Sequence, residues 1–344
     1  MIIDAHLDLA YNVTRGRDVR MPARQQPIAE GEIATVGFPD MKEGGVGLVF
    51  ATIFCQPHTP KHAGYTNPEE AHVQALSQLD QYDAWEREEW IAIERGSEVV
   101  GGGSGGASAP SPTSDARLRT YLLLEGAEAI RSVDDVQLFF DRGVRIVGLS
   151  WQRTRYAGGT ATPGPLTDAG REVVREFDRL GILHDASHLA ERSFWDVMNF
   201  TDRAIIASHS NCRHIVGRDP NERHLTDAMI RAIAERGGVI GMNFYDRFLL
   251  PFAEFGKRRA TLADVVAHIR HICDLTGSAD HVAIGTDLDG GLGREQVPQE
   301  ITTIADLGKL RDTLLTAGFT AEDAEKVMSG NWLRIIRRAG LRRP

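Results

Sequence analysis

Short apolar runs rich in branched and aromatic residues recur along the chain and alternate with longer amphipathic stretches. Runs of this kind, bounded by glycine and polar residues, are typical of buried parallel strands. Eight are present, at residues 2–5, 46–54, 120–124, 144–149, 181–186, 204–207, 238–242 and 282–285. The pattern therefore predicts eight strands, and most of them are followed by a helical segment.

The segments between these runs carry helix start and stop signals. Asn67 and Pro68 open a long helix with an N-cap residue and a proline at the first helical position. Three further helices begin with threonine and are followed by glycine, at residues 167–180, 226–236 and 261–275. Strands and helices that alternate in this way predict an α/β protein with a (β/α)8 TIM barrel. A doubly wound sheet is the alternative, but it needs fewer strands and usually has a glycine-rich turn after the first strand, which is absent here.

We expect residues 1–344 to form one barrel domain. Residues 101–114, with the sequence GGGSGGASAPSPTS, predict a flexible surface loop inserted before the third strand of the barrel. The last helical stretch, residues 321–339, is expected to form a C-terminal helix that packs under the barrel.

Composition narrows the class of protein. Apolar residues make up 42% of the 344 residues and charged residues 25%, which is typical of a globular protein, and the net charge of −9 disfavours nucleic acid and anionic membranes as partners. The three cysteines are widely spaced, which argues against a disulfide framework. A secretory signal and a membrane-spanning run are both absent, so we expect a cytoplasmic enzyme without a membrane partner.

Polar residues of metal-ligand or proton-transfer type follow five of the eight predicted strands. Active sites of barrels gather at the C-terminal ends of the strands, so residues at these positions are expected to meet. They are His6 and Asp8 after the first strand, Glu125 after the third, His188 after the fifth, His209 after the sixth and Asp287 after the eighth.

The number of ligands indicates two metal ions. His6, Asp8, Glu125, His188 and His209 are more ligands than one tetrahedral zinc takes from a protein. A glutamate can bridge two ions, and two divalent ions can hold a bridging hydroxide and polarise a carbonyl. Asp287 is then left to orient the water and carry its proton.

Other histidines have plainer interpretations. His214 and His224 lie in the loop after the sixth strand, where they could contact a substrate. His268 and His271 lie on a helix and are expected to be surface or packing residues.

Motifs along nearly the whole chain resemble those of the membrane (renal) dipeptidase family, zinc dipeptidases of the amidohydrolase-like superfamily. The resemblance is carried by His6-Leu-Asp8, Leu124-Glu125-Gly126, Asp185-Ala-Ser-His188, Ala207-Ser-His209-Ser-Asn211, Arg223-His-Leu-Thr-Asp227, Gly285-Thr-Asp287-Leu-Asp289-Gly290 and Gly330-Asn331-Trp-Leu-Arg334. It implies that His6 and Asp8 bind one zinc ion, that His188 and His209 bind a second, that Glu125 bridges the two, and that Asp287 is the acid and base. It also implies that Arg223 holds the C-terminal carboxylate of the substrate, which a guanidinium fork suits.

Two positions depart from the family pattern at the expected substrate site. Trp151 stands where many members have a histidine that contacts the substrate carbonyl, and an indole can donate a hydrogen bond but cannot carry a proton. Phe248 stands in the position of a substrate-contacting tyrosine, which removes a hydroxyl.

The sequence therefore predicts a binuclear zinc dipeptidase that cleaves dipeptides through a metal-bridging hydroxide, with other divalent metals as alternatives to zinc. The C-terminal residue of the substrate could be of D configuration, and the resemblance leaves a homodimer open. A related binuclear amidohydrolase acting on an N-acyl amino acid or a lactam is the nearest alternative, which Trp151 and Phe248 permit. A non-catalytic barrel that binds a metal or a partner is the third hypothesis, and the complete ligand set argues against it.

Overall fold

The computed structural model describes residues 1–60, 62–96 and 117–341. The predicted surface loop at residues 101–114 lies outside the described residues. Within the described ranges, no helix is long and apolar enough to span a bilayer.

All eight predicted runs form strands, and they are parallel. Six of them pair in sequence order: β1 (Ile2–Leu7), β2 (Val46–Phe54), β4 (Leu118–Glu125), β5 (Val144–Gly148), β6 (Leu183–Asp185) and β7 (Ile205–Ile206). The remaining two, β8 (Ile240–Met242) and β9 (Val282–Ile284), pair with each other. An additional short strand, β3 (Ile91–Ile93), pairs with the first residues of β4 and was not predicted.

The curved sheet closes into a barrel-like ring through a few specific contacts. A single parallel bridge between Ala207 and Ile240 joins the end of β7 to β8. On the other side, the Asp4 carboxylate in β1 accepts hydrogen bonds from the backbone amide and the hydroxyl of Thr286, the second residue after β9. The predicted α/β TIM-barrel class is therefore confirmed, with short strands in its second half.

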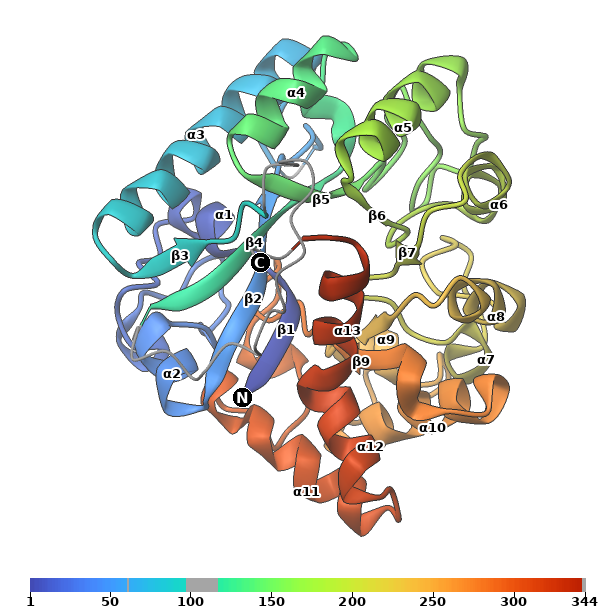
Figure 1. Ribbon diagram of the computed structural model, residues 1–344. Coiled ribbons are helices and arrows are strands. Elements are labelled where there is room, and N and C mark those ends of the chain that lie inside the picture. Colours follow the sequence, from blue (N-terminus) through green and yellow to red (C-terminus); the bar gives the residue numbers. More distant parts are fainter. Residues whose placement is uncertain (61, 97–116, 342–344) are drawn as a thin grey trace, which may run out of the picture.

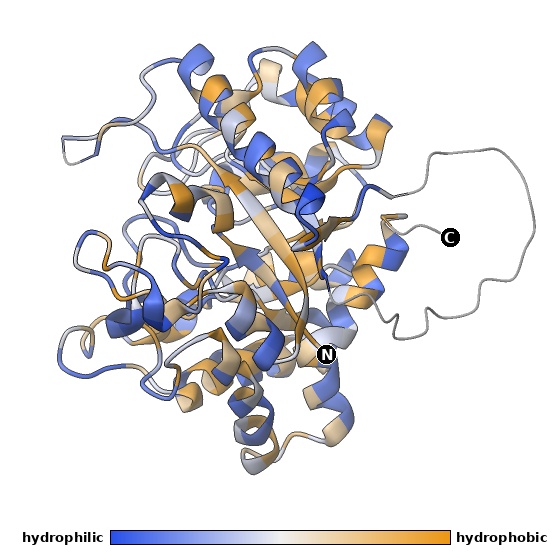
Figure 2. Ribbon diagram, turned by 90° about the vertical axis from the view of Figure 1, so that its left-hand side faces the viewer, coloured by the Kyte–Doolittle hydropathy of each residue, from blue (hydrophilic) through white to orange (hydrophobic). Residues whose placement is uncertain are grey.

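Helices surround this ring (Figure 1). The helices with at least eight residues are α3 (Pro68–Arg87), α4 (Asp134–Asp141), α5 (Asp168–Leu180), α6 (Glu191–Phe200), α8 (Asp227–Glu235), α10 (Leu262–Thr276), α11 (Gly308–Thr316) and α13 (Asn331–Arg338). Shorter helices are α1 (Leu9–Thr14), α2 (Phe38–Glu43), α7 (Arg213–Val216), α9 (Asp246–Leu249) and α12 (Ala321–Glu325). Figure 2 shows apolar strands at the centre and polar residues on the outer faces of the helices.

The helix boundaries follow from capping chemistry. The Asn67 side chain accepts a hydrogen bond from the Glu70 backbone at the start of α3. Thr167 and Thr226 cap α5 and α8 in the same way. At the start of α10, the backbone amide and the hydroxyl of Thr261 both donate to the Asp264 carboxylate. These contacts confirm the predicted helix starts.

The N-terminal end of the barrel is filled by the C-terminal helix α13. Its residues Trp332 and Ile335 are fully buried in one cluster with strand residues such as Phe50. The Trp332 indole donates a hydrogen bond to the Ile284 carbonyl of β9. In Figure 1 this helix lies across the ring of strands. The predicted closing helix is present, but a π-helical turn at Lys326–Gly330 separates α12 from α13.

Two glycines let β8 and β9 approach the loop after β7 closely. A β-carbon on Gly241 or Gly285 would come within 1.9 or 1.8 Å of the Ser208 carbonyl oxygen. Because Ser208 precedes His209, this close approach fixes the backbone that carries one of the predicted metal ligands.

Candidate metal centre

The six predicted strand-end residues meet at the C-terminal end of the barrel. His6 lies within β1, Asp8 follows that strand, and Glu125 ends β4. His188, His209 and Asp287 each lie three residues after the end of β6, β7 and β9. Their side chains are all buried or nearly so, since even the most accessible of them, that of Asp287, is only 13% exposed.

Glu125 occupies the centre of the cluster. One carboxylate oxygen, Oε2, lies 3.4 Å from His6 Nε2. The other, Oε1, lies 3.1 Å from His188 Nε2 and 3.4 Å from His209 Nε2. One oxygen of this carboxylate therefore faces His6, and the other faces His188 and His209.

A second group of ligand atoms lies on the side of β1. His6 Nε2 is 4.0 Å from Asp8 Oδ1 and 3.9 Å from Asp287 Oδ1. Ligand atoms of these three residues all lie within 4.8 Å of one another, as do those of His6, Glu125 and His209. His6 belongs to both groups and so joins the two halves of the cluster.

The chemistry of these atoms fits divalent cations. His188 Nε2 and His209 Nε2 face each other at 2.9 Å, and His6 Nε2 has no hydrogen-bond partner among the described residues. A buried polar atom without a partner costs free energy, which a cation bound at His6 Nε2 would offset. Imidazole and carboxylate groups are the ligands that zinc and similar ions prefer.

Hydroxyl groups hold the far nitrogens of the imidazoles. Ser208 Oγ lies 2.7 Å from His209 Nδ1 and 3.3 Å from His6 Nδ1, and it donates to Asp185 Oδ2 at 2.5 Å. Thr160 Oγ1 lies 2.9 Å from His188 Nδ1. Such contacts orient a ring so that Nε2 points at the metal position.

The outer partners were missed by the sequence prediction. Ser208 stands beside His209 in the sequence and Asp185 ends β6, so both lay inside motifs that were noted. Thr160 comes from a loop between β5 and α5, and nothing in the local sequence signals its contact with His188. Thr52 in β2, which donates to Asp8 Oδ1, was likewise not identified.

Burial of several carboxylates together changes their protonation. Burial raises the pKa of Glu125 to about 8 and the pKa of Asp287 to about 8. Burial, reinforced by the charge of Glu125, raises the pKa of Asp8 to about 6. Burial also lowers the pKa values of His188 and His209 well below the usual range, so both rings are neutral and can offer a lone pair.

Asp287 is held in an unusual conformation. Its backbone has a φ of +61°, and His188 has a φ of +67°, both in the left-handed region that residues other than glycine rarely adopt. Asn243 Nδ2 donates to Asp287 Oδ2 at 2.8 Å, which leaves Oδ1 directed toward His6.

Arg223 is buried beside the cluster. Its guanidinium donates to the His209 carbonyl at 2.6 Å and to Ser210 Oγ at 3.1 Å, while its Nε has no partner among the described residues. Burial lowers the pKa of Arg223, opposed by the charges of Asp287 and Glu125. The ring of Phe248 lies 5.1 Å from the guanidinium carbon.

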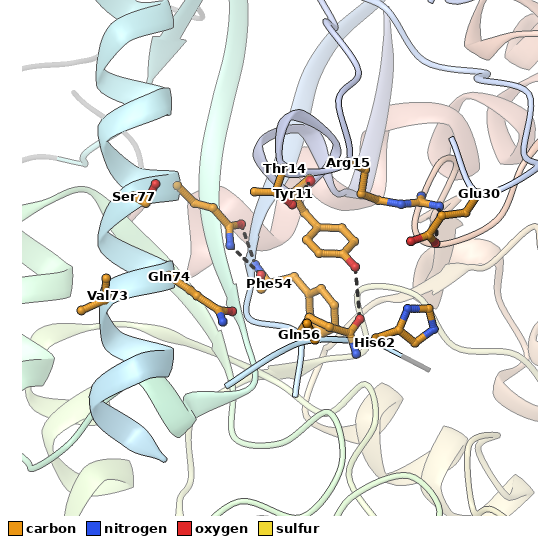
Figure 3. A pocket seen from close by; sticks show the side chains of 12 residues that line it. Tyr11, Thr14, Arg15, Glu30, Phe54, Gln56, His62, Val73, Gln74 and Ser77 are labelled. Atoms are coloured by element: carbon orange, nitrogen blue, oxygen red, sulfur yellow. Dashed lines mark hydrogen bonds and ion pairs between the residues drawn. The ribbon is translucent and has the colours of Figure 1, made fainter. Parts of the chain in front are cut away.

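The Trp151 side chain lies next to the cluster of predicted metal ligands, on the side of His188. Its indole is half-buried and lies 5.9 Å from the His188 ring and 5.3 Å from the Phe54 ring, measured between centroids. Phe54 in turn borders a cavity of about 630 Å³ between α1 and α3. Figure 3 shows this cavity with Tyr11, whose hydroxyl donates to Gln56. The two aromatic rings therefore lie between this cavity and the His188 side of the cluster.

Comparison with known proteins supplies the wider context. A sequence model of the membrane dipeptidase family, peptidase family M19, matches residues 1–343. A chain described as an uncharacterized protein in the pqqA 5′ region of Klebsiella pneumoniae is 34% identical over 59% of this chain and 75% of its own length. The dipeptidase tcpJ of Claviceps purpurea is 25% identical over 97% of this chain and 76% of its own length.

Solved structures resemble the whole barrel. A metallopeptidase of family M19 called dipeptidase AC shares 28% identity, with a TM-score of 0.77 over 98% of both chains. A metallopeptidase from Rhodobacter sphaeroides, bound to a phosphinate mimic of the dipeptide L-Ala-D-Ala, shares 26% identity with a TM-score of 0.77 over 98% of this chain and 99% of that chain.

Proposed function

Because this chain belongs to the membrane dipeptidase family, peptidase family M19, and is a metallo-dipeptidase of that family, we propose that it acts as a binuclear zinc dipeptidase. One observation carries the proposal: Glu125 Oε2 faces the His6 imidazole and Oε1 faces the His188 and His209 imidazoles, at distances of 3.1 to 3.4 Å. That arrangement suits a carboxylate that bridges two cations.

In this proposal, His6 and Asp8 hold the first ion, His188 and His209 hold the second, and Glu125 binds both. The 2.9 Å contact between His188 Nε2 and His209 Nε2 supports the second pair, and the 4.0 Å contact between His6 Nε2 and Asp8 Oδ1 supports the first. Two bound zinc ions would supply a nucleophile from water at neutral pH and polarise the scissile carbonyl.

Asp287 carries the proton in the proposed reaction. Its Oδ1 faces the cluster while Asn243 holds Oδ2, so one oxygen is free to accept the proton of the attacking water. The same oxygen can then donate that proton to the leaving amine, as a general acid. The buried setting, which raises the pKa of this carboxyl, favours a group that exchanges protons near neutral pH.

Arg223 binds the carboxylate of the substrate in this proposal. The side chain is buried, fixed by His209 and Ser210, and its Nε donates to no described residue. An arginine held in place in this way can bind a carboxylate through two hydrogen bonds at little further entropy cost. Phe248 packs beside the guanidinium and limits the space around it.

The substrate class is a dipeptide, and a D residue at its C-terminal side fits the proposal. The Rhodobacter sphaeroides relative binds a mimic of L-Ala-D-Ala, which supports this stereochemistry. Trp151 lies beside His188, where many members of the family have a histidine. An indole can donate only one hydrogen bond to a carbonyl, so a second substrate class is also tested. That second class is N-acyl amino acids or lactams.

The experiment compares hydrolysis rates of the zinc-loaded protein on L,L-dipeptides, L,D-dipeptides and N-acyl amino acids. Zinc content is measured in parallel, with Glu125→Gln as the matched variant that keeps size and removes charge. We expect the wild-type protein to hydrolyse dipeptides and to bind about two zinc ions per chain. We expect the variant to lose both the hydrolysis and the bound zinc. No hydrolysis of any dipeptide by a protein that carries its zinc would overturn the proposal.

A further inference from the structure

A second group of metal-ligand side chains lies outside the barrel mouth. His214 in α7, Asp227 in the first turn of α8 and His271 in α10 place one ligand atom each within 4.8 Å of one another. These three helices lie together on one side of the barrel (Figure 1). His271 lies more than forty residues after Asp227 in the sequence, so the fold brings it to the other two.

The contacts within this group are close. His271 Nε2 lies 2.8 Å from Asp227 Oδ1. The rings of His214 and His271 are stacked, with centroids 4.6 Å apart and planes only 12° from parallel. Two imidazoles and one carboxylate make up the ligand set of several three-residue zinc sites, in which water takes the fourth position.

We propose that His214, Asp227 and His271 form a peripheral site for a borderline divalent cation such as Zn²⁺. Ligand atoms around one tetrahedral zinc ion lie about 3.3 Å apart, so the group must contract by a small amount when the ion binds. His214 is exposed, and its ring is free to turn out of the stacked arrangement toward the other two. The cation takes the place of the 2.8 Å contact between His271 Nε2 and Asp227 Oδ1.

A neighbouring histidine is not available to this site. His268, one turn before His271 on α10, is fully buried and has both ring nitrogens engaged, with the backbone amide of Cys212 and the Leu249 carbonyl. These bonds hold α10 against the start of α7 and against α9. The part of α10 that carries His271 is therefore held in place, while the exposed side chain of His214 can change its rotamer.

The position of the site gives it a structural effect. His214 and Asp227 stand at the two ends of the segment 217–225, which carries Arg223. The backbones at these ends are already joined, because Arg213 and Leu225 are hydrogen-bonded. A cation held by His214, Asp227 and His271 ties both ends to α10 and stabilises the segment that places Arg223 beside the barrel mouth.

The test compares the intact protein with His214→Ala after equilibrium dialysis in a metal buffer that holds free zinc at low micromolar concentration. We expect the wild-type chain to bind one zinc ion more than the variant, whatever number the barrel mouth holds. The difference is independent of the proposed peptidase activity. Zinc should also raise the melting temperature of the wild-type protein by about 2–5 °C more than that of the variant.

Two further variants make the result specific. Asp227→Asn keeps the size of the residue in the first turn of α8 but weakens a ligand, so we expect it to lose the additional ion as well. His58→Ala removes another exposed histidine and should retain the wild-type zinc content. Equal zinc content in wild type and His214→Ala would overturn the proposal. If His58→Ala lost as much zinc as His214→Ala, the additional ion would be adventitious surface zinc, and this outcome would overturn the proposal too.

Discussion

Gly290 lies so close to Asp287 that a β-carbon at residue 290 would stand 1.8 Å from Asp287 Oδ1. Real β-carbons do not approach an oxygen this closely, so any side chain at residue 290 must displace the carboxylate. The glycine of the Gly-x-Asp-x-Asp-Gly motif is thus explained by the space that the Asp287 side chain needs.

Gly290→Ala should reduce hydrolysis about 10²-fold or more, because it moves the proposed proton carrier while leaving the metal ligands in place. Zinc content should remain that of the wild type. Gly291→Ala is the matched control: residue 291 has open space around it and a φ of +75°, so this variant should lose some stability but keep its activity. Full activity in Gly290→Ala would contradict the role of Asp287.

Ser208→Ala should weaken zinc binding about 10- to 100-fold, as expected when the residues that orient metal ligands are removed. Ser208 contacts both His209 Nδ1 and His6 Nδ1 and is anchored by Asp185, so its loss frees two rings at once. Competition with a chromophoric chelator measures the affinity. Ser77→Ala, at an exposed serine of α3, serves as the control, and an affinity unchanged in Ser208→Ala would refute the prediction.

The stability of the metal-free protein should fall as pH rises from about 5 to about 8 and should then level off. Burial raises the pKa values of Glu125 and Asp287 to about 8, so in the folded state these carboxyls stay protonated at pH values where the unfolded chain has released its protons. The stability they contribute is fully present below their unfolded pKa values and is lost as pH rises through about 8. Melting temperatures in the presence of a chelator, measured from pH 5 to 9, test this, and Glu125→Gln should flatten the profile.

Zinc affinity should change with pH in the opposite sense. Zinc must displace the proton of its ligand Glu125, so its affinity should fall about tenfold per pH unit as pH drops below about 8. Calorimetry in buffers of different ionisation enthalpy should detect the released protons. Zinc binding without proton release at pH 7 would contradict the raised pKa values.

The barrel and the meeting of the strand-end residues could be predicted from the sequence for a physical reason. Strand signals place residues at strand ends, and parallel strands bring all their C-terminal ends to one side, so His6 and Asp287 could be expected to meet although 280 positions separate them. The helix caps at Asn67 and Thr226 could also be predicted, because each depends on a hydrogen bond between a side chain and a backbone amide three residues further along the sequence.

The parts that escaped prediction depend on contacts with no local signal. Strand β3 is only three residues long and pairs with β4, and its short apolar pattern does not distinguish it from a loop. Thr160 supports His188 from a loop whose path is set by tertiary packing. The His214–His271 stack joins two helices that only the closed ring brings together.

Arg223→Lys should raise KM for dipeptides about 10²-fold with a smaller change in kcat, because an ammonium cannot form two parallel hydrogen bonds with a carboxylate. Dipeptide amides, which lack the C-terminal carboxylate, separate this effect from damage to the fold. Their hydrolysis should change little between wild type and variant. An equal loss on dipeptides and on their amides would contradict carboxylate binding by Arg223.

Trp151→His should raise turnover of dipeptides, and Trp151→Phe should not. The indole lies beside His188, at the position where the resemblance places a substrate-contacting histidine, and an imidazole there can donate a hydrogen bond to the developing oxyanion. Phenylalanine keeps an aromatic contact with Phe54 but offers no donor, so it controls for packing. We expect an increase in kcat of about tenfold for the histidine variant, somewhat below the usual worth of one oxyanion donor because the ring is not preorganised in this protein. Equal turnover in the two variants would show that Trp151 acts through the shape of the site, and rates on N-acyl amino acids would then identify the substrate that this shape favours.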